Sequence, residues 1–172
     1  MALVLVLGGA RSGKSAYVQR AAEAAAGART GARLVMIATA EASDAEMAER
    51  IARHQQSRGG HWSTVEAPLE LAPAVRNLAA DDCAVIDCLT LWLNNLLMAG
   101  RDTAAAAGDL VTALERSPAR IWAVSNEVGM GIVPENALAR LYRDEIGQLH
   151  QALAQAAERV VLMVAGMAVG VK

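Results

Sequence analysis

A glycine-rich segment near the start of the chain has the residue types and spacing of a phosphate-binding loop. Residues 8–15 read G-G-A-R-S-G-K-S, which fits the pattern G-x-x-x-x-G-K-[S/T]. The glycines let such a loop curl so that its backbone N–H groups point toward an anion. Lys14 can then reach the β- and γ-phosphates, and the hydroxyl of Ser15 can bind Mg²⁺. The sequence therefore predicts a nucleoside triphosphate site. The residues of this loop are Gly8, Gly9, Ala10, Arg11, Ser12, Gly13, Lys14 and Ser15.

A second candidate is the acid that ends an apolar run. Asp87 follows Ala84-Val85-Ile86, a pattern typical of a buried strand. An acid at such a strand end can hold Mg²⁺ directly or through water, so we expect Ser15 and Asp87 to be the metal ligands. The alternative is that Asp87 only ends the strand and caps the next helix. Asp81 and Asp82, at the other end of the run, are interpreted as turn residues.

The chain has three histidines, and one of them could do chemistry on phosphorus. His54 lies beside the apolar stripe of a helix expected over 44–58, and a neutral ring nitrogen can attack phosphorus to form a phosphoramidate. Such an intermediate divides a nucleotidyl transfer into two displacements, with pyrophosphate leaving in the first. From the residues alone, a partly buried structural histidine is the simpler interpretation. His61 is expected in a loop, and His150 is expected to pack within the last helix.

A long polar connection follows another apolar run. Residues 125–136 read S-N-E-V-G-M-G-I-V-P-E-N. Ligands of doubly wound sheets bind beyond the carboxyl ends of the strands, so Asn126 and Glu127 are placed to touch a ligand. Pro134 can occupy the first turn of the next helix. The alternative is an ordinary strand–helix connection without a ligand.

The elements that must position these residues alternate between short apolar runs and longer helical patterns. This favours an α/β fold of the P-loop NTPase (RecA-like) type, with a mostly parallel sheet and helices on both faces. The predicted strands cover residues 3–7, 34–38, 83–87, 121–125 and 160–164, with a weaker edge strand over 62–66. The predicted helices cover residues 14–26, 44–58, 69–80, 89–99, 103–116 and 135–158. No linker or repeat divides the 172 residues, which are expected to form one domain.

Composition argues against several classes of partner. The net charge is −2 and aromatic residues make up 3%, so neither a basic field nor stacking platforms favour nucleic acid as a partner. The longest apolar stretch, residues 160–171, is too short to span a bilayer, and no signal-peptide pattern is recognisable. Cys83 and Cys88 do not fit a metal-ligand pattern and are expected to be buried, reduced thiols. We expect a cytoplasmic protein.

Five segments together resemble one family, the bifunctional adenosylcobinamide kinase / adenosylcobinamide-phosphate guanylyltransferases of cobalamin biosynthesis. The phosphate loop alone is generic. The string N-E-V-G-M-G-I-V-P-E-N and the helix that carries His54 are specific to this family. The resemblance extends over nearly the whole chain in the same order. Its segments are residues 8–15, 37–39, 44–54, 61–62 and 126–136.

The resemblance implies two activities. One is phosphorylation of adenosylcobinamide with ATP or GTP; the other is transfer of GMP from GTP to adenosylcobinamide-phosphate, giving adenosylcobinamide-GDP and pyrophosphate. It also implies a guanylylated histidine at His54 and a homotrimer, and Lys14 is suited to neutralise charge on the departing pyrophosphate. The nucleotide contacts carried over beyond the phosphate loop are Ile37, Ala38, Thr39, Gln55, Gln56, Ser57, Arg58, Glu66 and Asp87.

The chain departs from the family pattern at two positions. Arg53 precedes the expected nucleophile, where relatives often have a second histidine, and Asp87 stands where they often have Glu. The shorter acid favours a water-mediated contact with the metal or ribose. Two other functions stay open on the sequence: a small-molecule kinase in which His54 is structural, and an NTP-dependent switch or assembly module.

Overall fold

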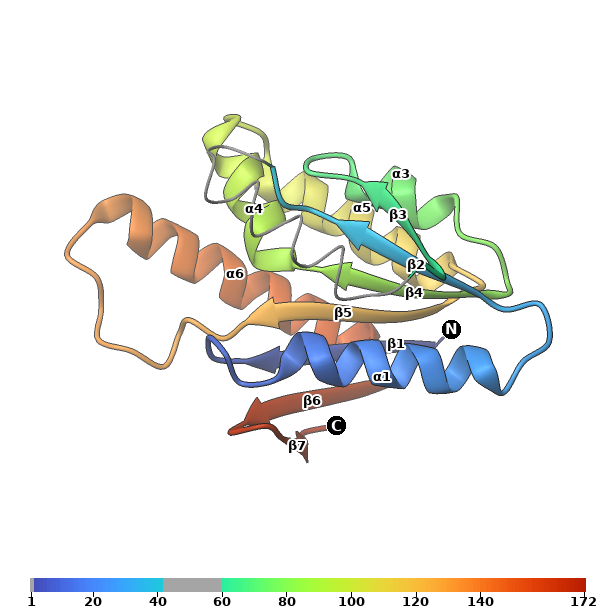
Figure 1. The fold of residues 1–172 in the computed structure, drawn as a ribbon. Helices are drawn as coiled ribbons and strands as arrows, with labels where there is room; N and C mark the ends of the chain where they lie inside the picture. The colour runs from blue at the N-terminus through green and yellow to red at the C-terminus, as the bar shows by residue number, and fades with distance from the viewer. Residues whose placement is uncertain (1, 42–59) are drawn as a thin grey trace.

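The centre of the molecule is a seven-stranded sheet in the order β3-β2-β4-β5-β1-β6-β7 (Figure 1). The structure, a computed structural model, describes residues 2–41 and 60–172. Neighbouring strands run parallel from β3 to β6, whereas β7 pairs antiparallel with β6. This arrangement confirms the predicted α/β fold with a mostly parallel sheet. The strands are β1 (Ala2–Gly8), β2 (Arg33–Ala38), β3 (Trp62–Glu66), β4 (Asp82–Asp87), β5 (Arg120–Asn126), β6 (Arg159–Val164) and β7 (Met167–Gly170).

Helices cover both faces of the sheet (Figure 1). α1 packs on one face, and α3 to α6 supply the apolar residues packed on the other. The helix predicted over 44–58, which includes His54, lies outside the described residues. No helix in the described ranges is long and apolar enough to cross a membrane. The described helices are α1 (Lys14–Gly27), α3 (Leu71–Arg76), α4 (Leu89–Met98), α5 (Thr103–Arg116) and α6 (Ala137–Ala156).

Strand β4 shows how the two apolar layers are built. Ala84 and Ile86 belong to the layer beneath α3 to α6, whereas Cys83 and Val85 belong to the layer beneath α1. Successive residues of a strand point to opposite faces, so a strand covered on both sides needs apolar residues at almost every position. This explains the nearly continuous apolar runs in the sequence. Both cysteines are free and buried, as expected.

Two helices are shorter than the sequence prediction. The helix predicted over 69–80 is confined to Leu71–Arg76, because the chain turns at Asn77 to begin the approach to β4. The last helix begins at Ala137, with Asn136 as its N-cap accepting the N–H of Ala139 at 3.1 Å. An asparagine side chain can satisfy a free N–H of the first turn, which sets the start of the helix. Pro134 therefore precedes the helix and does not occupy its first turn.

The sequence prediction also missed a strand and misread an acid. β7 folds back on β6 through Ala165 and Gly166, which adopt φ values of 49° and 81°. Asp82 is not a turn residue: it begins β4, is 1% exposed, and accepts Nε and Nη2 of Arg33 at 2.8 and 3.1 Å. It also accepts the N–H of Ala79 at 2.8 Å. Three donors to one buried carboxylate fix the entry of β4 into the sheet.

Candidate nucleotide site

The phosphate loop connects β1 to α1 at the carboxyl edge of the sheet and is braced by the β6–β7 turn. Gly8 and Gly13 adopt φ values of 151° and 97°, which L side chains rarely take. A Cβ on Gly8 would lie 2.6 Å from the backbone oxygen of Met163 and 2.7 Å from Oγ of Ser12. The N–H of Gly166 donates to the carbonyl of Ser12 at 3.0 Å. The loop is therefore held in one curled shape by backbone contacts.

Lys14 is the buried cation of this loop. Its ammonium donates to the carbonyl oxygens of Gly8 and Gly9 at 2.9 and 2.6 Å. Burial lowers the pKa of Lys14, while the nearby Cys88 and Asp87 act in the opposite direction. Among the described residues, the hydrogen-bond partners of the ammonium are neutral carbonyls, so none of these contacts is a salt bridge that a phosphate would have to replace.

Asp87 lies across the site from the first turn of α1. Its Oδ2 accepts a hydrogen bond from Oγ of Ser15 at 3.3 Å. The preceding residues Cys83 and Val85 face α1, and Asp87 continues this alternation to the same face. Hydroxyl and carboxylate oxygens are the ligands that Mg²⁺ takes, together with waters and substrate phosphates. Within residues 2–41 and 60–172, no group of three or more His, Cys, Asp or Glu forms a metal cage.

Strand β5 lies between the strand of the loop and the strand of Asp87. Asn126 ends β5 in register with Gly8, and Val124 is in register with Asp87. Val124 belongs to the layer beneath α1, so Asn126, two residues later, reaches the same face as Asp87. Its Nδ2 lies 3.5 Å from Oγ1 of Thr90. Asn126 is therefore placed beside the phosphate loop.

Glu127 is turned toward the other face of the sheet. Its N–H donates to the carbonyl of Gly8 at 3.0 Å, but its Oε2 lies 3.8 Å from Nδ1 of His150 on α6. His150 is buried, and its Nε2 lies 2.7 Å from Oγ of Ser125. Burial lowers the pKa of His150, and Glu127 acts in the opposite direction. His150 thus packs within the fold, as expected, and also links α6 to the end of β5.

The remaining predicted nucleotide contacts divide between the sheet edge and the core. Ala38 ends β2 in register with Glu66 on one side and Asp87 on the other, so all three lie at the carboxyl edge. The side chain of Ile37 is fully buried in the core. The structure therefore brings Glu66, Asp87 and the loop to one edge of the sheet. His54, Gln55, Gln56, Ser57 and Arg58 lie outside the described residues.

Thr39 holds the connection between β4 and α4. Its buried hydroxyl donates to the carbonyl of Cys88 at 2.7 Å and accepts the N–H of the same residue at 2.8 Å. Nδ2 of Asn95 donates to the carbonyl of Thr39 at 2.8 Å. Sequence reasoning missed Asn95 and Thr90. The only signal for them was the presence of polar residues in the otherwise apolar helix L-T-L-W-L-N-N-L-L-M.

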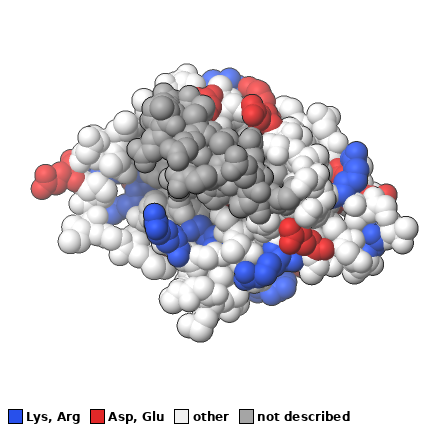
Figure 2. Space-filling model, in the orientation of Figure 1, with Lys and Arg blue, Asp and Glu red and all other residues white. Residues whose placement is uncertain are grey.

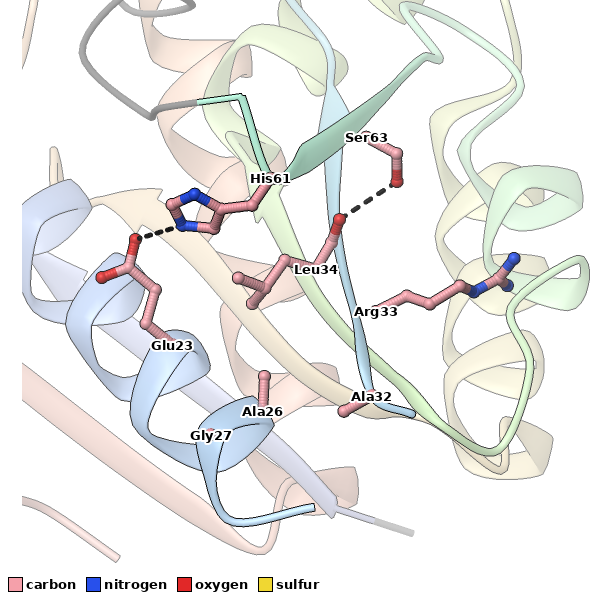
Figure 3. A pocket seen from close by; sticks show the side chains of 8 residues that line it. All are labelled: Glu23, Ala26, Gly27, Ala32, Arg33, Leu34, His61 and Ser63. Atoms are coloured by element: carbon pink, nitrogen blue, oxygen red, sulfur yellow. Dashed lines mark hydrogen bonds and ion pairs between the residues drawn. The ribbon is translucent and has the colours of Figure 1, made fainter. Parts of the chain in front are cut away.

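The surroundings of the site carry both signs of charge. On the face drawn in Figure 2, acidic and basic side chains are interspersed, and basic groups lie near the start of α1. A separate groove lies between α1 and the β2–β3 edge (Figure 3). In it, His61 Nε2 lies 3.6 Å from Glu23 Oε1, which also accepts Nε1 of Trp62 at 3.1 Å. The groove includes Arg33 at the amino end of β2, so it lies away from the carboxyl edge.

Comparison with known proteins identifies the family of this chain. Residues 4–171 match the sequence profile of the family described as cobinamide kinase / cobinamide phosphate guanyltransferase. The chain is 48% identical over 172 residues to the bifunctional adenosylcobalamin biosynthesis protein CobP of Pseudomonas aeruginosa, covering 98% of this chain and 96% of that protein. It is 41% identical over 186 residues to the bifunctional adenosylcobalamin biosynthesis protein CobU of Salmonella typhimurium, covering 99% of each. The chain therefore belongs to the cobinamide kinase / cobinamide phosphate guanyltransferase family.

Proposed function

We propose that the protein phosphorylates adenosylcobinamide with ATP or GTP and then transfers GMP from GTP to the resulting phosphate in cobalamin biosynthesis. The family match and the names of the relatives support this pair of activities. In the structure, the observation that carries the nucleotide part is the convergence of Lys14, Ser15 and Asp87 at one edge of the sheet. These residues supply a cation, a hydroxyl and a carboxylate around a loop of backbone N–H groups.

Further features of the site fit a bound polyphosphate. Oγ of Ser12 is buried and has no hydrogen-bond partner among the described residues, so it is a donor suited to a phosphate oxygen. Lys14 can exchange its carbonyl contacts for the β- and γ-phosphates. Ser15 and Asp87 fit a Mg²⁺ ion that would neutralise those phosphates, and the short side chain of Asp87 favours contact through water. The substrates would be GTP and ATP, with Mg²⁺ as cofactor.

The guanylyl transfer would pass through His54. Its ring nitrogen forms a bond to the α-phosphorus of GTP, and the bond from that phosphorus to the bridging oxygen breaks, releasing pyrophosphate. A phosphate oxygen of adenosylcobinamide-phosphate then attacks the same phosphorus, and the P–N bond breaks to restore the imidazole. Lys14 would stabilise the charge that develops on the pyrophosphate. Support for His54 and for contacts from Gln55 to Arg58 comes from the family resemblance.

The decisive test is covalent labelling. After incubation with α-labelled GTP and Mg²⁺, the protein should carry an acid-labile, base-stable adduct, and its intact mass should rise by one GMP unit. The substitution His54→Ala should abolish the adduct, whereas His61→Ala should retain it. An adduct on His54→Ala would show that the nucleophile is another residue. Transfer of γ-phosphate to adenosylcobinamide without any protein label would favour the small-molecule kinase.

We also propose that the chain works as a single domain within a homotrimer. The single domain rests on the length of the chain and the lack of a linker, and the homotrimer rests on the resemblance. Light scattering of the purified protein should give three times the chain mass of 18.0 kDa. A mass of one chain at the concentration of the activity assay would contradict it.

A further inference from the structure

We propose that Asn126 donates a side-chain N–H to the terminal phosphate of the bound nucleotide and thereby makes the site favour a triphosphate over a diphosphate. The inference rests on the nucleotide site of the proposed function and adds a specificity-determining residue to it. Asn126 is not part of the phosphate-loop pattern. Its position in the sheet, and not its place in the sequence, brings it to the site.

The placement follows from strand register. β5 is the strand between β1, which leads into the phosphate loop, and β4, which ends in Asp87. Asn126 is in register with Gly8, and Asp87 is in register with Val124. Both Val124 and Val85 face α1, so Asn126 and Asp87 reach the same side of the sheet as Lys14. The amide of Asn126 therefore lies between the phosphate loop and Asp87.

The side-chain amide of Asn126 has one weak hydrogen bond, and its remaining hydrogen-bonding capacity is unused among the described residues. Among the described residues its one side-chain partner is Oγ1 of Thr90, at 3.5 Å, which is the outer limit of a hydrogen bond. Thr90 is itself fixed: its carbonyl accepts the hydroxyl of Tyr142 at 3.0 Å, and its Oγ1 lies 2.9 Å from Sγ of Cys88. Burial raises the pKa of Tyr142 to about 12, so its hydroxyl stays a donor at neutral pH. A fixed neighbour and a weak bond leave the amide N–H groups available to a ligand.

The chemistry of an amide suits the terminal phosphate. A side-chain amide can donate to a phosphoryl oxygen and stays uncharged at neutral pH. The neighbouring Glu127 cannot take this role, because its carboxylate is turned toward His150 on the opposite face. The loop N–H groups and Lys14 would contact the β-phosphate, which diphosphates and triphosphates share. Asn126, which lies beyond the loop, would add a contact to the terminal phosphate that a diphosphate lacks.

The test compares the binding of two analogues whose α,β-methylene bridge prevents transfer of the GMP group. Calorimetric titration of the full chain with the α,β-methylene analogues of GTP and GDP, in the presence of Mg²⁺, gives the ratio of the two dissociation constants. Asn126→Ala should weaken triphosphate binding about tenfold and diphosphate binding less than about twofold. Asn77→Ala is the matched control, since this exposed amide lies at the end of α3, away from the carboxyl edge, and should leave the ratio unchanged.

The outcomes separate this inference from the proposed function. A wild-type ratio in Asn126→Ala would overturn the role of Asn126 while leaving Lys14-dependent nucleotide binding intact. If the alanine variant does not fold, Asn126→Asp, which keeps the shape and adds a repelling charge, decides: retention of the wild-type ratio overturns the proposal. Two results would contradict the proposed nucleotide site itself: the wild-type chain binds neither analogue, or the variant Lys14→Met binds both analogues as tightly as the wild type does. The role of Asn126 would then fail with the site.

Discussion

Oγ of Ser15 lies 3.3 Å from Oδ2 of Asp87, although 72 positions separate the two residues in the chain. The contact joins the first turn of α1 to the end of β4, and a whole strand, β5, lies between β4 and the strand that precedes α1. The pair therefore spans the switch point of the sheet, where ligands of such folds bind. Two oxygen donors held at this point provide a place for Mg²⁺ beside the phosphates.

The first prediction concerns the charge of Asp87. Asp87→Asn keeps the shape of the side chain but removes the negative charge, so it should lower Mg²⁺-dependent transfer of phosphate and of GMP by roughly 100-fold. Asp87→Glu, which keeps the negative charge, should retain most of the activity. Initial rates at varied Mg²⁺ measure the effect.

Asp81→Asn is the control for this prediction, because Asp81 is an exposed acid that immediately precedes β4, at its opposite end. It should behave as the wild type. Full activity of Asp87→Asn at limiting Mg²⁺ would exclude this carboxylate as a ligand of the metal.

The second prediction concerns the shape of the phosphate loop. Gly8→Ala should lower the free energy of unfolding by about 2–4 kcal/mol, because its Cβ would lie 2.6 Å from a backbone oxygen and its φ is 151°. Gly9→Ala is the matched substitution, since a Cβ at Gly9 would meet no heavy atom within 4 Å. It should change the free energy of unfolding by less than about 1 kcal/mol. Urea unfolding measures both, and equal losses would contradict the role assigned to Gly8.

The part of this structure that could be predicted from the sequence is the local part. The phosphate loop, the apolar strands and the acid at the end of β4 each appear as a short pattern, because their conformation depends on neighbours in the chain. Asn126 and Glu127 show where local reasoning ends. Both were expected to touch a ligand, yet strand alternation sends Asn126 toward the loop and Glu127 toward His150.

Non-local pairing explains the other errors. The local sequence around Asp82 is typical of a turn. The partner of Asp82 is Arg33, which lies 49 positions earlier in the chain and comes beside it because β2 pairs with β4. The sequence prediction did not separate β7 from β6, because the turn at Ala165 and Gly166 is short and both strands lie in one apolar stretch, residues 160–171. Gly166 was its only local signal, and the sequence pattern does not say that the following four residues pair back with β6.

The third prediction concerns Asp82. Its carboxylate is 1% exposed and accepts hydrogen bonds from Arg33 and from the N–H of Ala79, so Asp82→Ala removes the buried acceptor that joins the starts of β2 and β4. The free energy of unfolding should fall by about 2 kcal/mol, because water can replace the carboxylate at the exposed donors. Asp81→Ala removes the neighbouring acid, whose contact with Arg29 at 3.4 Å is exposed, and should cost less than about 1 kcal/mol. Similar losses in the two variants would show that the buried carboxylate of Asp82 has no special role.

The last prediction concerns pH. Burial lowers the pKa of His150 from its ordinary value of 6.5, so the folded protein holds this ring neutral under conditions in which the unfolded chain would protonate it. Below pH 6.5 the unfolded state therefore binds more protons at this site, and the free energy of unfolding falls as the pH is lowered. His150→Gln removes this contribution, so the stability advantage of the wild type over the variant should shrink from about pH 7 to about pH 5. Urea unfolding across that range measures it, with His61→Gln as the exposed control. An advantage that is constant or grows at low pH would mean that the pair with Glu127, at 3.8 Å, outweighs burial.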